Sequence, residues 1–127
     1  HITHLESAKK KCDVLIVGVA VDKYSTNRNP ETGRPVFSQF LRAFVISRLK
    51  CVDFVVFDKA FDLSLLYNIK PDVYIKGQDF MNDKNKERDR KDTINALNFY
   101  GGELYITQDE KLSTTDILHH IKDKIKL

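Results

Sequence analysis

The chain has 127 residues, of which 42% are hydrophobic and 31% are charged, and its formal net charge is +3. This length suits one domain with a real core, and the composition excludes a disordered or low-complexity protein. No apolar run reaches the ~18 residues that a membrane span needs. The mild positive charge does not by itself indicate nucleic acid, and it suits a small anionic ligand equally well. We therefore expect a cytoplasmic protein without membrane or nucleic-acid partners.

The two cysteines, Cys12 and Cys51, lie far apart and belong to no metal or redox motif. We expect two free thiols in a reducing compartment. The chain opens at His1 without a Met, which we interpret as the start of a fragment of a longer polypeptide.

The first half of the chain alternates between predicted helices and strands. Residues 5–11 contain Ala8 and three Lys and predict a helix, and the continuous apolar run 14–21 predicts a strand buried on both faces. A polar loop with Asn, Pro and Gly follows at 22–33. Apolar residues at helical spacing predict a helix over 36–50, and 52–57 predicts a second strand.

The second half continues this alternation. The charge-dense stretch 81–91 predicts a solvated loop or a helix start that runs into a helix through Phe99, and Gly101 with Gly102 predicts a turn. The remaining elements are a short helix, a third strand, a fourth strand and a last helix at residues 63–68, 73–75, 104–106 and 115–125.

Such alternation predicts parallel strand pairing with right-handed crossovers, and hence a three-layer α/β fold in which residues 1–127 form a single domain. Ligands of such sheets bind beyond the carboxyl ends of the strands. Three polar segments leave these ends: the 22–34 loop, the loop at Lys76 and the loop at Ser113. We expect them to meet at one rim.

Each of these segments has a functional and a structural interpretation. A Lys that ends a buried strand is costly unless it faces a ligand rim, and Gly77 after Lys76 lets a ligand approach the backbone; the alternative is a simple turn. Ser113, Thr114 and Thr115 open the last helix, where amides and hydroxyls bind phosphate; the alternative is an ordinary cap.

Two arginines bracket the start of the 36–50 helix. Arg34 precedes it and Arg42 lies within it. Either one could hold a phosphate through a bidentate guanidinium contact. The alternative is a solvated helix face.

In this order and spacing the segments resemble the nucleotidyltransferase, or cytidylyltransferase-like, superfamily whose members carry a His-x-Gly-His motif. The most similar branch is the adenylyltransferase domain of ADP-heptose synthase, and glycerol-3-phosphate cytidylyltransferase is a more distant relative. The matching segments span nearly the whole chain: Asp13–Val21, Arg34–Val36 with Arg42, Val52–Val56, Lys70–Phe80, and Gly101–Gly102 followed by Ser113–Thr115.

The resemblance also sets the register of the N-terminus. In the family about twelve residues separate the second motif His from the Asp before the next strand. His1 stands twelve residues before Asp13 and His4 stands nine before it. His1 therefore resembles the second motif His, and His4 occupies a helix position that is usually aromatic or apolar. The first motif His and the first strand of the fold are then absent from this chain.

The resemblance implies a Rossmann-like parallel sheet with helices on both faces and without its first strand. It implies transfer of a nucleotidyl group to a sugar or polyol phosphate with release of pyrophosphate, and poor turnover by this truncated chain alone. The implied catalytic residues are His1 and Arg34; the nucleotide-binding residues are Lys76, Gly77, Asp79, Ser113, Thr114 and Thr115; the substrate-phosphate residues are Lys23, Arg28 and Arg42. Mg²⁺ is expected on the phosphates without a metal site in the protein, together with a homodimer and a fused or partner sugar kinase domain.

The chain departs from the family pattern in two places. The loop before Arg34 offers only Lys23 and Arg28 as basic residues. The segment 109–112 lacks the Arg that cytidylyltransferases carry, which favours ATP over CTP. The alternatives are a CTP-dependent cytidylyltransferase acting on a polyol phosphate such as glycerol 3-phosphate, a nucleotide-binding domain without turnover, and a flavodoxin-like domain.

Overall fold

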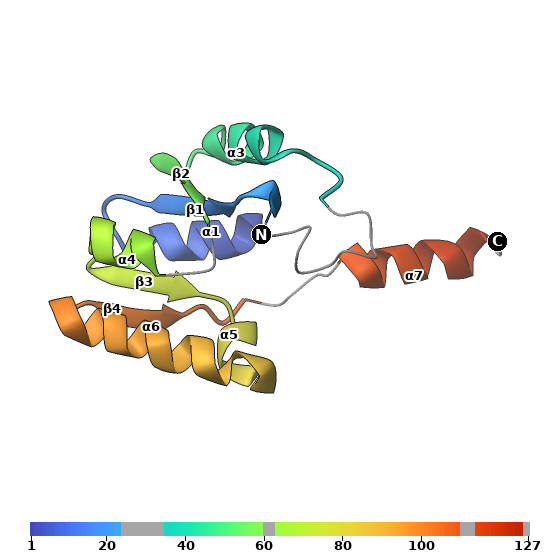
Figure 1. Cartoon of the computed structure of the whole chain (residues 1–127). Coiled ribbons are helices and arrows are strands. Elements are labelled where there is room, and N and C mark those ends of the chain that lie inside the picture. The colour runs from blue at the N-terminus through green and yellow to red at the C-terminus, as the bar shows by residue number, and fades with distance from the viewer. Residues whose placement is uncertain (24–34, 60–62, 110–113, 126–127) are drawn as a thin grey trace.

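The computed structural model describes residues 1–23, 35–59, 63–109 and 114–125 (Figure 1). Within these ranges helices alternate with short strands, as the sequence predicts. In chain order the elements are α1 (Ile2–Lys9), β1 (Ile16–Ala20), α3 (Gln39–Ser47), β2 (Phe54–Asp58), α4 (Ser64–Ile69), β3 (Val73–Lys76), α5 (Asp79–Asn82), a 3-10 turn (Lys84–Lys86), α6 (Glu87–Tyr100), β4 (Glu103–Ile106) and α7 (Thr114–Ile125).

Strand pairing is parallel throughout the described residues. β1 pairs with β2 from Ile16 opposite Phe54 onward, and β3 pairs with β4 from Val73 opposite Glu103 onward. Parallel strands with flanking helices confirm the predicted α/β class. The strands are divided between two two-stranded sheets, β1–β2 and β3–β4, and no described backbone pairing joins the two.

The best-buried core lies under the β3–β4 sheet. Leu66 from α4 packs with Ala96 and Leu97 from α6, and the half-buried Tyr74 and Leu104 of the two strands complete the cluster. On α6 the buried side chains recur at helical spacing, so this otherwise polar helix presents one apolar stripe to the sheet.

Helix α6 ends at a glycine for a conformational reason. Gly101 has φ of +84°, a left-handed conformation that glycine adopts without strain. The backbone amides of Gly101 and Gly102 both donate to the carbonyl of Leu97, at 2.8 and 2.9 Å. This pair of hydrogen bonds satisfies the end of α6 and turns the chain into β4.

Helix α3 covers the β1–β2 sheet and begins at a side-chain cap. The Ser38 hydroxyl accepts a hydrogen bond from the amide of Leu41 at 3.2 Å, which places the start of the helix after Ser38. Phe40 lies edge-on to Phe57 of β2, with ring centroids 5.5 Å apart. No residue of α3 is buried, and Phe40 remains 68% exposed.

The charge-dense stretch 81–91 is helical over most of its length. It comprises the end of α5, the 3-10 turn and the first residues of α6. Arg90 closes this corner, because its guanidinium donates to the carbonyls of Phe80 and Asp83 at 2.9 and 2.7 Å. Of the helices in the described ranges, none combines the length and apolar character required to cross a bilayer.

Candidate functional site

The carboxyl end of β3 places a lysine and a glycine together, as the sequence predicts. Lys76 is half-buried, and its ammonium lies 5.2 Å from the ring centroid of Tyr74 and 5.6 Å from that of Phe80. A cation held against two aromatic faces is stabilised and held in position. A Cβ built on Gly77 would meet no atom within 4 Å, so the backbone there borders open space.

Beside this end of β3, two side-chain hydrogen bonds join helix α1 to the segment that follows β4. The Nδ1 atom of His4 lies 2.8 Å from the hydroxyl oxygen of Thr107, and the Ser7 hydroxyl donates to Oδ1 of Asp109 at 2.8 Å. Thr107 is 3% exposed. The other carboxylate oxygen of Asp109 is buried without a hydrogen-bond partner. This pair of contacts fixes the N-terminal half of α1 at the carboxyl rim of the β3–β4 sheet.

The imidazole of His4 is biased toward its neutral form. Burial lowers its pKa below the usual value, and the positive charges of the N-terminus and of Lys76 act in the same direction. The carboxylate of Asp109 opposes this shift; its influence is smaller than that of burial but larger than that of either positive charge. A neutral imidazole keeps an acceptor nitrogen for the Thr107 hydroxyl, which a doubly protonated ring lacks.

The carboxyl end of β1 is organised by an ion pair. Nη2 of Arg42 donates to Oδ1 of Asp22 at 2.7 Å, and Nε of Arg42 donates to the carbonyl of Phe37 at 3.1 Å. The amide of Asp22 in turn donates to the side-chain carbonyl of Gln39 at 2.9 Å. These contacts orient the Arg42 guanidinium and engage two of its five N–H donors, which leaves others for an anion.

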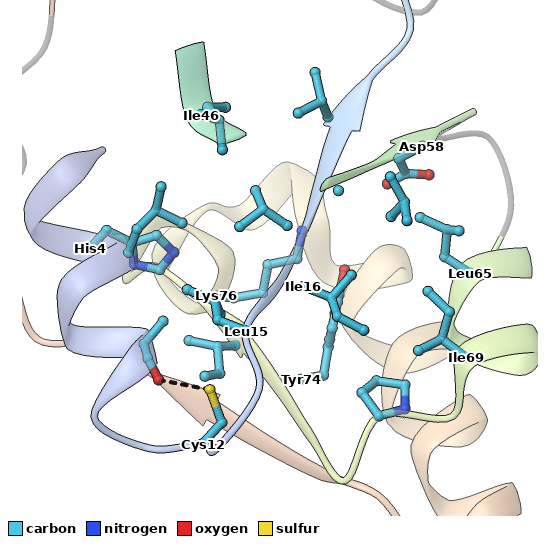
Figure 2. Close-up of a pocket in the computed structure, with 18 of the residues that line it drawn as sticks. His4, Cys12, Leu15, Ile16, Ile46, Asp58, Leu65, Ile69, Tyr74 and Lys76 are labelled. Carbon is cyan, nitrogen blue, oxygen red and sulfur yellow. Dashed lines mark hydrogen bonds between the residues drawn. The ribbon is translucent and has the colours of Figure 1, made fainter. Parts of the chain in front are cut away.

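A large cavity lies between the two sheets and receives residues from both rims (Figure 2). Its volume is about 1240 Å³, and its lining comes mainly from α1, β1, α3, α4 and β3, with Val56 and Asp58 from β2. His1, Arg42 and Lys76 all contribute to the lining. In Figure 2 the Lys76 side chain extends toward the middle of the cavity. Apolar side chains such as Leu15, Ile46 and Ile69 also line the cavity.

The structure therefore brings together three of the predicted site residues: His1, Arg42 and Lys76 line the same cavity, although His1 itself is exposed. Lys23 and Asp79 are exposed at their respective rims. Arg28, Arg34 and Ser113 lie outside the described residues, as do the side chains of Thr114 and Thr115, whose backbone opens α7. Figure 1 shows α7 beyond the ends of β1 and β3, on the rim side of the molecule.

Sequence reasoning did not select the polar contacts of α1. His4 was expected at an aromatic or apolar position, and Ser7, Thr107 and Asp109 were not proposed for the site. The partners of each contact are 103 and 102 residues apart, so no local spacing could reveal them. The sequence likewise identified Asp22 only as the first residue of a polar loop, and its ion pair with Arg42 was not predicted. Within the described ranges, no group of three or more His, Cys, Asp or Glu side chains could hold a metal ion.

Comparison with protein families gives a match over almost the whole chain. Residues 1–120 match the family model described as "Cytidylyltransferase-like". The match begins at His1 and includes both strand pairs, the cavity and the rims described above.

Curated relatives and a solved structure agree with this match. The chain is 38% identical over 125 residues to "Bifunctional protein HldE" of Campylobacter jejuni, and 33% identical over 124 residues to the protein of the same name from Helicobacter pylori. These alignments cover 98% and 96% of this chain but only 25% and 24% of the relatives, so the chain spans about a quarter of their length. The crystal structure of the lipopolysaccharide core biosynthesis protein from Thermoplasma volcanium superposes with a TM-score of 0.64 at 32% identity, covering 89% of this chain and 86% of that one.

Proposed function

The chain belongs to the cytidylyltransferase-like family, and from this premise we propose that it is an adenylyltransferase domain that transfers AMP from ATP to a sugar phosphate and releases pyrophosphate. The observation that carries the proposal is the convergence of His1, Arg42 and Lys76 on one cavity at the rims of parallel strands. Cationic and N–H-bearing side chains in such a position suit a triphosphate and a second phosphate.

The proposed reaction is a direct displacement. An oxygen of the acceptor phosphate attacks the α-phosphorus of ATP, the bond from that phosphorus to the bridging oxygen breaks, and pyrophosphate leaves with the electron pair of that bond. No covalent enzyme intermediate is needed. The protein contributes by positioning the two phosphates and by stabilising the charge that develops on the leaving group.

Each rim has a distinct role in this proposal. Lys76 supplies a positive charge whose direction is fixed by the rings of Tyr74 and Phe80, and the open backbone at Gly77 admits the nucleotide closely. Arg42, oriented by Asp22, contacts a substrate phosphate with its remaining donors. We further assign a donor role to His1 and phosphate contacts to Arg34, to Lys23 or Arg28, and to the Ser113–Thr115 helix start, with Asp79 beside the nucleotide.

Mg²⁺ is proposed to enter on the triphosphate. The described residues offer no cluster of carboxylates that would form a metal site, and Mg²⁺ is commonly bound through substrate phosphates and waters with few protein ligands. When bound it neutralises phosphate charge. The positioning of phosphates by Lys76 and Arg42 does not depend on a protein-bound metal.

Three observations favour the substrates named here. The segment 109–112 carries no Arg, which favours ATP over CTP. The similar Thermoplasma protein is named for lipopolysaccharide core biosynthesis, which supports a sugar phosphate as acceptor. The relatives are called bifunctional and are about four times as long, which supports a fused second activity, for which we propose a sugar kinase. A homodimer is also proposed from the family resemblance.

The test is pyrophosphate release by the full-length protein with Mg²⁺, a sugar 1-phosphate and, separately, ATP or CTP. We expect turnover with ATP, and we expect Lys76→Ala to lower it by about 10²–10³, the usual cost of losing one charge-stabilising donor. Lys84→Ala, at an exposed lysine of the 3-10 turn, serves as the matched control and should not change the rate.

The outcomes separate the alternatives. Turnover with CTP and none with ATP would overturn the base assignment and favour the cytidylyltransferase branch. Saturable ATP binding without pyrophosphate release would favour a nucleotide-binding domain without turnover. Equal rates for the Lys76→Ala and Lys84→Ala proteins would remove Lys76 from the site.

A further inference from the structure

Thr107, just after β4, joins α1 to the carboxyl end of β3. Its hydroxyl oxygen lies 2.8 Å from Nδ1 of His4 in α1, and its backbone amide donates to the carbonyl of Lys76 at 2.9 Å. Thr107 is only 3% exposed, so the loss of either partner would leave one of its polar groups buried and unpaired, which is costly. One residue thus connects two elements that both line the cavity.

The contact with Thr107 lies on the side of α1 that begins at His1. His1, His4 and Ser7 recur every three residues, a spacing that places side chains on neighbouring turns along one side of a helix. The Ser7 hydroxyl donates to Asp109, two residues after Thr107 in the same segment. Two points of α1 are therefore held by two points of the segment that follows β4.

Apolar burial contributes little to the position of α1. Among its residues only the small Ala8 is buried. The far end of the helix is held by Lys9, whose Nζ lies 2.6 Å from Oδ2 of Asp53. Apolar packing has no preferred direction, whereas a hydrogen bond has a preferred distance and angle. The direction of the first turns of α1 therefore depends mainly on the hydrogen bonds of His4 and Ser7.

A small change in this direction would displace His1 appreciably. His1 and Lys9 are eight residues apart, which is about 12 Å along a helix. A rotation of the helix by about 10° around the Lys9 end would move His1 by about 2 Å. A misplacement of about 1 Å at a reacting centre can lower a rate about 10²-fold.

We propose that His4 and Thr107 are positioning residues for nucleotidyl transfer, because their hydrogen bond holds the His1 end of α1 at a fixed place relative to Lys76. This role rests on the proposed function, in which His1 and Lys76 both act on phosphates. Figure 2 shows His4 on α1 and Lys76 on β3 at the border of the same cavity. Thr107 acts through these two neighbours and does not touch the substrates.

The test uses variants of the full-length protein at one buried threonine. Thr107→Val removes the hydroxyl and keeps the shape and the backbone amide, whereas Thr107→Ser keeps the hydroxyl. The matched control is Thr93→Val, the same change at a threonine of α6 that is 2% exposed and does not line the cavity.

The first readout is pyrophosphate release with ATP, Mg²⁺ and a sugar 1-phosphate. Thr107→Val should lower kcat by about 10- to 100-fold and change KM for ATP by less than about twofold, because misplaced donors act mainly on the transition state. Thr107→Ser should recover most of the rate, and Thr93→Val should not change it. A merely structural role would lower the melting temperatures of Thr107→Val and Thr93→Val similarly and leave kcat unchanged.

A double-mutant cycle identifies the partner of the hydroxyl. His4→Phe should lower kcat as Thr107→Val does, and the double variant should lose no more than either single variant, because all three lack the same hydrogen bond. Losses in kcat that multiply in the double variant would overturn the proposal.

The second readout is amide hydrogen exchange without nucleotide. The amide of Leu5 donates to the carbonyl of His1 at 2.9 Å, in the first turn of α1. Thr107→Val should speed the exchange of this amide about fivefold, as expected for the loss of one hydrogen bond that holds the helix start. Thr107→Ser and Thr93→Val should leave this exchange unchanged.

The outcomes distinguish this proposal from the proposed function. Turnover of the unmodified protein with an unchanged kcat in Thr107→Val would overturn the positioning role and leave the proposed function intact. Unchanged exchange of the Leu5 amide in Thr107→Val would also overturn it, as would a loss of kcat that Thr107→Ser does not recover. The absence of pyrophosphate release from the unmodified protein with both ATP and CTP would overturn the proposed function, and the positioning role with it.

Discussion

The two halves of the molecule use the same parallel pairing but cover their sheets differently. Under β3–β4, helices α4 and α6 together bury Leu66, Ala96 and Leu97 to 4% exposure or less. Over β1–β2, helix α3 buries none of its own residues, and Phe44 and Phe54 remain 55% and 61% exposed. The core of the described structure is therefore concentrated in one half, and the other half depends on what covers its apolar surface.

The rims of the two halves also differ in chemistry. The β1 rim carries a charged pair, Arg42 with Asp22, whereas the rim of β3 and β4 combines the hydrogen bond between His4 and Thr107 with the cation of Lys76. A ligand with two phosphates spanning the cavity would meet a guanidinium at one rim and an ammonium at the other. Under the proposed function, this difference would allow the two phosphates to be recognised separately.

The largest expected difference concerns the core. Leu97→Ala should lower the free energy of unfolding by about 2–5 kcal/mol, because it removes a side chain that is only 2% exposed and leaves a cavity. Phe44→Ala, which removes a larger but half-exposed side chain, should cost about 1 kcal/mol or less. Urea denaturation of both variants at one protein concentration measures the difference.

If Phe44→Ala lowered the free energy of unfolding as much as Leu97→Ala, the two halves would not differ in how well their apolar residues are covered. It would mean that the α3 surface is covered in solution, and sedimentation of the unmodified protein would then show whether a second copy covers it. A small cost for Leu97→Ala would instead remove the cluster of Leu66, Ala96 and Leu97 as the main core.

Sequence patterns predicted the elements well where apolar residues dominate. The apolar run 14–21 contains β1, and the helical spacing over 36–50 contains α3, whose start is fixed by the Ser38 cap. The secondary structure of the stretch 81–91 was harder to predict from the sequence, because charged residues at solvent-exposed positions fit a loop and a helix equally well. The division into two two-stranded sheets was not foreseen, because an apolar run identifies a strand but not its neighbour.

The sequence placed correctly the residues that end a strand, but it did not reveal contacts between distant segments. Lys76 and Gly77 could be placed at a rim from topology alone. The contact of His4 with Thr107 depends on how α1 packs beside β4, which no local motif encodes. Arg42 was selected for its charge, and only the structure shows that Asp22 orients it.

An effect of intermediate size is expected for the dependence of folding stability on pH, which acts through His4 at the β3–β4 rim. Because burial lowers the pKa of His4 in the folded state, the unfolded chain binds more protons as the pH falls below the ordinary His value of about 6.5. The contribution of neutral His4 to stability is therefore complete above that pH and is lost as the pH falls through the folded-state pKa.

His4→Gln should remove this dependence while costing about 1 kcal/mol near neutral pH, the usual value of one hydrogen bond. Thermal unfolding between pH 5 and 8 (a window around the ordinary His value) compares the variant with the unmodified protein. Identical slopes of melting temperature against pH in the two proteins would show that His4 is not the titrating group.

The smallest expected effect belongs to Arg88 of α6, and Arg90 of the same helix provides the comparison. Arg88 lies 4.0 Å from Asp92 and its side chain is 92% exposed, so Arg88→Ala should change the free energy of unfolding by less than about 0.5 kcal/mol, as for other exposed ion pairs. Arg90 donates to two backbone carbonyls that close the corner between α5 and α6, so Arg90→Ala should cost about 1–3 kcal/mol. Urea denaturation of the two variants at low and at 0.5 M salt (enough to screen exposed charges) separates the contributions, because only the exposed pair should weaken with salt. Equal costs for the two variants would mean that the Arg90 contacts are as dispensable as a surface pair, and that the stability of the β3–β4 half comes from its apolar core alone.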